Sequence, residues 1–238
     1  MWVMTPTWQS AAQGLVGDLR NVFGDRLRSV VAYGPHIEGD DATALACLAL
    51  VTSHEIPDFE ACARHAARWR RNRIDTPLVL SETEFQTSLD AFPLEYGEII
   101  RAHQRVYGDD PFDGVAITQA DLRRACETQI KSHLIHLREG FLESGGSPAA
   151  VADVVAASAP AFTALLRHVA WLSGSPARDR LGATREGARA AGIAEGLVAD
   201  MIALEQKPGG RATDPARLFP AYVQAVEQLA RTVDRWRV

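Results

Sequence analysis

Two largely apolar runs separated by a short polar turn constrain this 238-residue chain more than any other feature. The runs span residues 28–34 and 43–51, and the turn between them contains Gly34 and Gly39. Valine, leucine and alanine follow one another in both runs, without the polar alternation of a strand that has one face in water. The pattern therefore predicts two strands that are buried on both faces near the centre of a sheet.

The composition is that of a globular protein with a sizeable core. Hydrophobic residues make up 47% of the sequence, and the length fits one large or two small domains. We predict two domains, residues 1–114 and 115–238. The boundary is placed there because the segment GDDPFDG at 108–114 is dense in turn-forming residues.

Charge, cysteine content and hydropathy exclude several functional classes. With 25 basic and 30 acidic residues, the net charge of −5 gives no general attraction to a nucleic-acid backbone. The 3 cysteines are widely separated without a CxxC pair, so neither a disulfide framework nor a zinc knuckle is predicted. The N-terminus does not read as a signal peptide, and we find no run of about 18 apolar residues. We expect a soluble, reduced, cytoplasmic protein without a membrane span.

Hydrophobic periodicity assigns further elements in the first half of the chain. These are helices at 7–23 and 57–71, a strand at 76–80, a helix opened by a Ser81–Glu84 capping box, and strand character over 93–108. The mixture of strands and helices indicates a small sheet with flanking helices.

The second half of the chain shows helical patterns alone. We predict four helices: one capped by Thr118, one opened by Ser147 and Pro148, one at 184–204, and one opened by Asp214 and Pro215. Pro160 is expected to kink or split the second helix, and Gly192 is a candidate break in the third. Four helices joined by short polar loops are typical of a bundle. The predicted fold class is α+β, a mixed sheet with flanking helices followed by an all-α helical bundle.

The two strands and their turn resemble the signature of the DNA polymerase beta-like nucleotidyltransferase superfamily. In that family a Gly-Ser turn is followed, on the next strand, by two acidic residues flanking one apolar residue. Aligned without gaps, Gly34 matches the first glycine, Pro35 replaces the serine and Gly39 matches the second glycine. Ala46 and Leu48 replace the two acids. The segment FPLEYGEIIRAHQRVYG at 92–108 also resembles a late sheet region of bacterial nucleotidyltransferase-like proteins.

The replaced residues remove the chemistry that the resemblance implies. Nucleotidyl transfer needs divalent metal to neutralise the triphosphate, and magnesium needs oxygen ligands that Ala46 and Leu48 do not offer. Pro35 has neither the N–H nor the hydroxyl that would hold a phosphate oxygen. We therefore predict a catalytically inactive relative, a pseudoenzyme with no metal cofactor.

Six residues are candidates for nucleotide binding. They are Gly34, His36 and Gly39 in the turn, and Arg64, Arg68 and Arg71 on the helix predicted at 57–71. Guanidinium groups match phosphate geometry and could hold a triphosphate or an acidic partner. The alternative is a solvated helix face, because no aromatic residues interleave with the arginines as stacking platforms for bases would.

Glu95, Glu38 and Asp40 are weak candidates for metal ligands. The resemblance places a third metal ligand on a later strand, and Glu95 falls in that region. Glu38 and Asp40 would have to act from the turn, where a solvated acidic loop explains them equally well. One acid alone binds magnesium poorly, so Mg²⁺ is expected only if the protein is active with unusual ligands.

Three functional hypotheses follow from these patterns. The leading one is a non-catalytic binding or regulatory module for a nucleotide or a protein partner. The first alternative is an active metal-dependent nucleotidyltransferase that uses Glu95, Glu38 or Asp40. The second alternative is a structural scaffold whose bundle forms a homo-oligomer interface. His133 and His136, one helical turn apart, fit structural roles better than a metal site because no acid stands at a suitable spacing.

Overall fold

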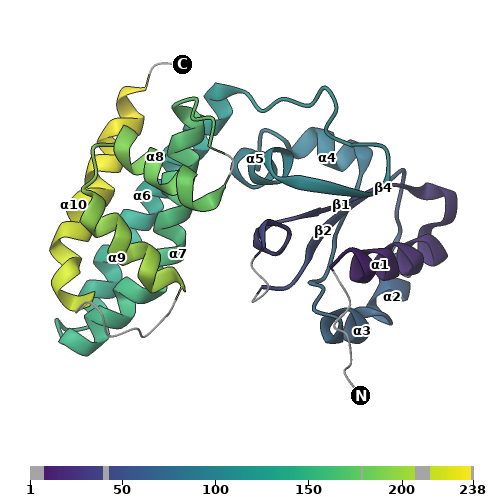
Figure 1. Cartoon of the computed structure of the whole chain (residues 1–238), viewed down its shortest axis with the longest axis horizontal. Coiled ribbons are helices and arrows are strands. Elements are labelled where there is room, and N and C mark those ends of the chain that lie inside the picture. Colours follow the sequence, from purple (N-terminus) through teal and green to yellow (C-terminus); the bar gives the residue numbers. More distant parts are fainter. Residues whose placement is uncertain (1–7, 40–42, 178, 207–214, 237–238) are drawn as a thin grey trace. The chain divides into compact units, whose positions relative to one another are not determined.

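The computed structural model describes residues 8–39, 43–177, 179–206 and 215–236. The chain divides into two compact units, Met1–Ile117 and Thr118–Val238, shown in Figure 1. We call the first the sheet unit and the second the helical unit. The division falls close to the boundary predicted after Gly114.

The sheet unit contains a four-stranded mixed sheet in the order β3-β2-β1-β4. β1 (Leu27–Tyr33) pairs antiparallel with β2 (Ala46–Val51) and with β4 (His103–Gly108), whereas β3 (Leu78–Ser81) runs parallel to β2. The two strands predicted from the apolar runs are therefore the central pair, β1 and β2, as expected.

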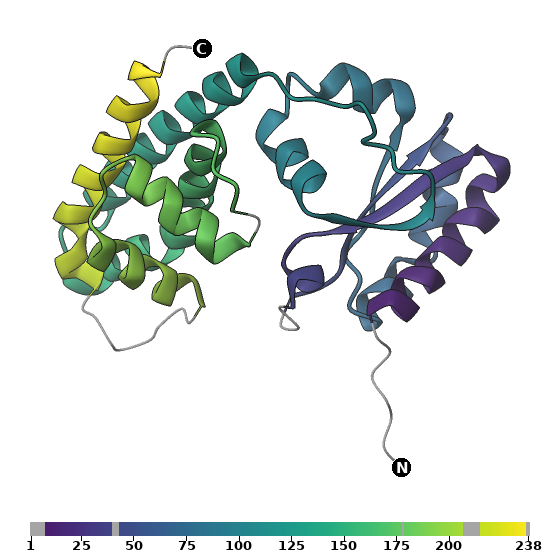
Figure 2. The same cartoon turned by 45° about the horizontal axis from the view of Figure 1, so that its top comes forward.

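Helices cover both faces of this sheet, which explains why β1 and β2 are apolar throughout. Val30 and Ala32 lie in a core cluster with residues of α1 (Trp8–Phe23), α2 (Ile56–Ala63) and α3 (Ala66–Arg71). Val31 points the other way, into a cluster with residues of α4 (Glu82–Ser88) and α5 (Pro93–Arg101). Figure 2 shows α1 and the α4–α5 pair on opposite sides of the sheet.

Local capping signals are confirmed where they were predicted. The Ser81 side chain accepts from the Glu84 N–H while the Glu84 side chain accepts from the Ser81 N–H, which completes the capping box of α4. The Thr118 hydroxyl likewise accepts from the Asp121 N–H at the start of α6 (Gln119–Glu143). These helix starts are set by residues within one turn, so the sequence is sufficient to find them.

Two predictions in the sheet unit are wrong. Residues 93–101 form helix α5 instead of a strand, and only His103–Gly108 pairs with β1. Pro93 stands in the first turn of this helix, where its fixed φ is favourable and its missing N–H is not needed. The helix predicted over 57–71 is two short helices, α2 and α3, separated at Arg64 and His65.

The helical unit contains five described helices where the sequence predicted four. They are α6, α7 (Pro148–Leu172), α8 (Arg180–Ala190), α9 (Glu195–Gln206) and α10 (Pro215–Arg235). α8 and α9 take the place of the helix predicted at 184–204, and the break lies at Gly192, at φ 69°, the position named as a candidate break. Asp214, the predicted cap of the last helix, lies outside the described residues.

α7 is the central helix of this unit. It contacts α6, α8, α9 and α10, and it continues through Pro160, where the sequence predicted a kink or a break. By length and composition alone, α7 would be able to cross a membrane. Its side chains from Phe162 to Leu172 are largely buried within the unit.

Candidate functional site

The turn between β1 and β2 has the backbone geometry that its glycines permit. Gly34 has φ 85° and Gly39 has φ 102°, and L-residues with a side chain rarely adopt either value. Between them, Pro35–Glu38 forms a short 3-10 helix, and the Gly39 N–H donates to the His36 carbonyl at 3.2 Å. The shape of the turn therefore depends on both glycines.

Hydrogen bonds to the Thr43 carbonyl close this turn onto the approach to β2. His36 Nδ1 lies 2.9 Å from that oxygen, and Arg73 Nη2 donates to it at 3.2 Å. Because a carbonyl oxygen only accepts, His36 Nδ1 carries the proton. The Arg73 carbonyl in turn accepts from the Leu45 N–H at 2.8 Å. His36, predicted as a nucleotide-binding candidate, thus stabilises the turn itself.

Ala46 and Leu48, the positions matched to the family's acids, lie opposite Tyr33 and Val31 in the antiparallel pairing of β1 and β2. Ala46 is half-buried, and Leu48 is only 1% exposed. Leu48 belongs to the apolar cluster beneath α4 and α5, with Phe85 among its members. A carboxylate at position 48 would therefore be buried among apolar side chains, which strongly disfavour its charged form. The position belongs to the core.

Burial also keeps the neighbouring titratable groups of this strand pair neutral. It raises the pKa of the Cys47 thiol to about 12. It also raises the pKa of the Tyr33 phenol, with further contributions from Cys47 and Asp75. Neither group ionises near neutral pH, so neither is an activated nucleophile.

The structure describes two of the three candidate metal ligands, Glu95 and Glu38. Glu95 lies exposed in the first turn of helix α5, which corrects its expected position on a strand. Glu38 is exposed at the end of the 3-10 turn, and Asp40 lies outside the described residues. Within residues 8–39, 43–177, 179–206 and 215–236, no group of three or more His, Cys, Asp or Glu side chains could hold a metal ion.

The three candidate arginines have different surroundings. Arg68 forms an ion pair with Asp18 of α1, and Asp18 is only 6% exposed. The Asp18 carboxylate also accepts a hydrogen bond from Trp69 Nε1 at 2.8 Å. Arg68 therefore holds α3 against α1, although it is exposed to solvent, as Arg64 and Arg71 also are. Sequence patterns did not identify Asp18 as the partner of Arg68. An acid beside the apolar stripe of the first helix was the available signal, because a buried carboxylate needs a partner.

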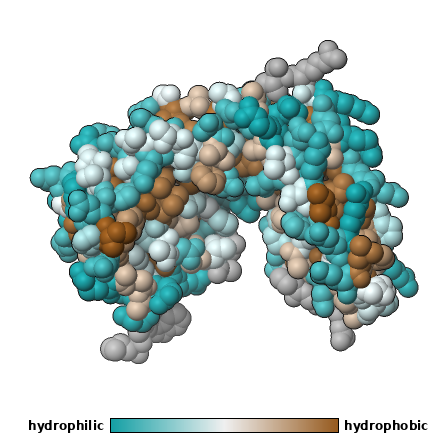
Figure 3. Space-filling model, turned by 180° about the vertical axis from the view of Figure 1, so that it is seen from behind, coloured by the Kyte–Doolittle hydropathy of each residue, from teal (hydrophilic) through white to brown (hydrophobic). Residues whose placement is uncertain are grey.

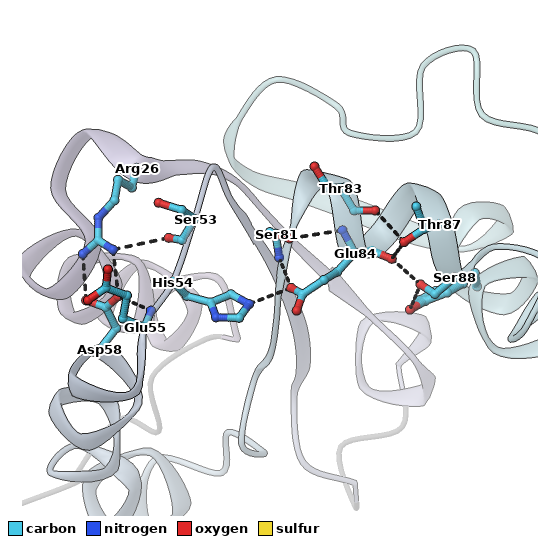
Figure 4. Close-up of polar contacts among 11 residues, drawn as sticks. Arg26, Ser53, His54, Glu55, Asp58, Ser81, Thr83, Glu84, Thr87 and Ser88 are labelled. Atoms are coloured by element: carbon cyan, nitrogen blue, oxygen red, sulfur yellow. Dashed lines mark hydrogen bonds and ion pairs between the residues drawn. The ribbon is translucent and has the colours of Figure 1, made fainter.

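A histidine–carboxylate pair that sequence patterns did not predict lies beyond the carboxyl ends of β2 and β3 (Figure 4). His54 Nε2 is 2.6 Å from Glu84 Oε2, and that oxygen also accepts from the Ser81 N–H at 2.7 Å. The Ser81 backbone bond and the His54 bond lower the pKa of Glu84 to about 2. Glu84 is ionised at neutral pH and is fully engaged as a cap, so the pair orders the start of α4. No local pattern links two residues 30 positions apart.

In the helical unit, His133 takes part in a buried hydrogen-bond chain. Its Nε2 lies 2.6 Å from the Tyr222 hydroxyl of α10, and that hydroxyl donates to the Ser158 carbonyl of α7 at 3.4 Å. Burial, with a smaller effect from His136, lowers the pKa of His133 to about 4. His133 is neutral near pH 7 and connects three helices, which supports its predicted structural role.

The helical unit also has an apolar groove of about 530 Å³. Its lining includes Phe141, Val151, Phe219 and Val223, from α6, α7 and α10. The rings of Phe141 and Phe219 stack with centroids 4.7 Å apart. None of the residues predicted as site candidates lines this groove.

No protein-family model matches this sequence, and no curated protein matches it. A solved structure does match the fold: the crystal structure of spectinomycin adenyltransferase AAD(9) from Enterococcus faecialis with ATP and spectinomycin. The match has a TM-score of 0.60 and 11% sequence identity, and it covers 97% of this chain and 100% of that chain. At this identity the likeness concerns the fold alone. The chain therefore has a nucleotidyltransferase-like α+β fold, as the strand pair and its turn predicted.

Proposed function

We propose that this protein is a catalytically inactive nucleotidyltransferase-like protein that acts as a binding or regulatory module. The burial of Leu48 carries the proposal, because that position is 1% exposed within an apolar cluster. A metal-dependent nucleotidyltransferase needs carboxylate oxygens that bind metal beside the triphosphate. At this position of the sheet the side chains are apolar and closely packed. The protein accordingly needs no metal cofactor for its role.

A nucleotide is the first ligand to test. The turn keeps both left-handed glycines, Gly34 and Gly39, while the residues that would support transfer are replaced. Arg64 and Arg71 are exposed on the same unit and could pair with phosphate oxygens. Loss of transfer chemistry does not require loss of binding, because positioning a phosphate uses backbone and guanidinium groups that need no metal.

An activity assay tests the catalytic half of the proposal. The protein is incubated with Mg²⁺ or Mn²⁺ and each nucleoside triphosphate, and released pyrophosphate is measured. We expect no release above background. Release that is lost in a Glu95→Gln variant, but kept in a Glu139→Gln control on the exposed surface of α6, would contradict the proposal. It would establish the metal-dependent enzyme instead.

A binding assay tests the other half. Thermal shift and calorimetry are carried out with ATP and other nucleotides in the absence of metal. We expect a stabilising shift that falls in an Arg64→Ala/Arg71→Ala double variant and stays unchanged in an Arg185→Ala control on exposed α8. If no nucleotide shifts the melting temperature, a nucleotide is ruled out as the ligand. The binding hypothesis then requires a protein partner.

A further inference from the structure

β3 is an edge strand with little protection against pairing. It pairs with β2 on one side, and no described strand pairs with its other side. Residues 76–81, TPLVLS, contain no charged side chain. Leu78 is 38% exposed, and Val79, Leu80 and Ser81 are half-buried. Elsewhere on the molecule too, on the face drawn in Figure 3, apolar residues, in brown, lie among polar ones, in teal. Soluble proteins normally protect such edges with charges or covering elements.

The opposite edge of the same sheet shows what this protection looks like. β4 carries an exposed arginine, Arg105. Its Val106 carbonyl accepts a hydrogen bond from Gln13 Nε2 of α1 at 3.3 Å. Charge and a hydrogen bond from α1 therefore protect β4. In β3, by contrast, Leu78, Val79 and Leu80 carry no charge, and the charged Glu84 side chain bonds only the last residue, Ser81.

Opposite charges flank β3 at its two ends. Before the strand, residues 70–75 contain three exposed arginines, Arg70, Arg71 and Arg73, and one exposed aspartate. After it, the first turn of α4 contains the exposed Glu82 and also Glu84, whose carboxylate is held by Ser81 and His54 but keeps its negative charge. In an antiparallel pair of identical strands, the start of each strand lies beside the end of the other. A two-fold axis through β3 would therefore bring the basic segment of one copy toward the acidic turn of its partner.

We propose that two copies of this chain associate through antiparallel pairing of β3 with β3. The outward-facing backbone N–H and C=O groups supply the hydrogen bonds, and Leu78, Val79 and Leu80 supply apolar contact. Pro77 has no N–H and limits the pairing to the residues that follow it. The proposal goes beyond the binding role above and does not depend on whether a nucleotide binds.

Light scattering after gel filtration, over a series of protein concentrations, tests the association. We expect the full-length protein to be a dimer whose dissociation constant rises with salt, because the flanking charges are exposed. Leu78→Lys places a charge on the pairing edge and is expected to raise the dissociation constant about tenfold or more. The matched control is Leu142→Lys in α6, a leucine that is 77% exposed on the helical unit.

A second variant distinguishes a weakened dimer from a misfolded protein. Glu82→Arg replaces one of the two acids in this turn with a base, and the 3.6 Å pair of Glu82 with Arg28 is an exposed contact of small energetic weight. We expect this variant to weaken the dimer while circular dichroism stays unchanged, whereas Glu139→Arg on the helical unit leaves it intact. A monomer at every concentration would overturn the proposal. So would a dimer that survives Leu78→Lys and Glu82→Arg but is lost in Leu142→Lys.

Discussion

Leu48 shows how one side chain determines what the strand pair can do. Its neighbours in the cluster include Val31, Leu50, Phe85 and Tyr96, which leave it almost no contact with water. An acid introduced at this position would lose its hydration without gaining a metal, because the described residues offer no cluster of further ligands there. A metal site built at this position would therefore require changes in the surrounding core as well.

Leu48→Asp should therefore destabilise the sheet unit by about 3 kcal/mol or more without creating metal binding. Ala46→Asp, at the half-buried neighbour on the same face, should cost about 1 kcal/mol or less. Urea unfolding followed by circular dichroism measures both. A Leu48→Asp protein as stable as the unmodified chain would show that the cluster is open to water.

His133 should make stability depend on pH in the acidic range. Its pKa is lowered from 6.5 to about 4 in the folded protein, so the unfolded chain binds more protons between these two values. Its contribution is fully present above pH 6.5 and is lost as the pH falls toward about 4. The loss amounts to at most about 3.4 kcal/mol.

Urea unfolding of the unmodified protein and a His133→Gln variant at several pH values tests this. The difference in unfolding free energy between the two proteins should shrink as the pH is lowered through that window. Other titrating groups affect both proteins equally and cancel in the difference. A difference that is constant with pH would show that folding does not lower the pKa of His133.

At the scale of elements, close helix packing is the feature that sequence patterns conceal. A Cβ on Gly187 of α8 would lie 1.7 Å from the Leu166 carbonyl oxygen of α7. Only a glycine lets the two backbones approach this closely. The sequence gives no sign of this role, because a glycine inside a helical pattern ordinarily reads as a weak position.

Gly187→Ala should therefore destabilise the helical unit by about 2–4 kcal/mol, since the added methyl group meets backbone that cannot move aside. Gly196→Ala in α9 meets no heavy atom within 4 Å and should be neutral or stabilising by about 0.5–1 kcal/mol. Thermal unfolding of the two variants makes the comparison. Equal melting temperatures would show that α7 and α8 separate readily.

At the scale of the whole molecule, each unit has its own core. The sheet unit buries two apolar clusters on the two faces of its sheet, and the helical unit packs four helices around α7. A unit with its own core can in principle fold alone. How each unit is stabilised can thus be studied separately.

Residues 118–238 expressed alone should accordingly give a helical circular dichroism spectrum and a cooperative urea transition. The Gly187→Ala change should lower the midpoint in this fragment as it does in the complete chain. A fragment that is helical but unfolds without a cooperative transition would show that its core depends on the sheet unit.

Much of the fold followed from local and periodic patterns. The apolar runs predicted β1 and β2, and the capping residues Ser81 and Thr118 predicted two helix starts. Helix α5 was mistaken for a strand because a segment of nine residues contains too few repeats to separate the two periods. The partners of His36 and Asp18 were also out of reach, since hydrogen bonds between distant residues leave no periodic pattern in a sequence.

The sequence by itself determined the order of the two halves, the buried central strand pair and the absence of acids at positions 46 and 48. These properties depend on side-chain type and on spacing along the chain, which the sequence displays directly. The tertiary structure decided that Leu48 is sealed in a core, that Arg68 is held by Asp18, and that β3 lies at an edge. Burial and pairing depend on which distant segments meet, and only the folded chain brings those segments together.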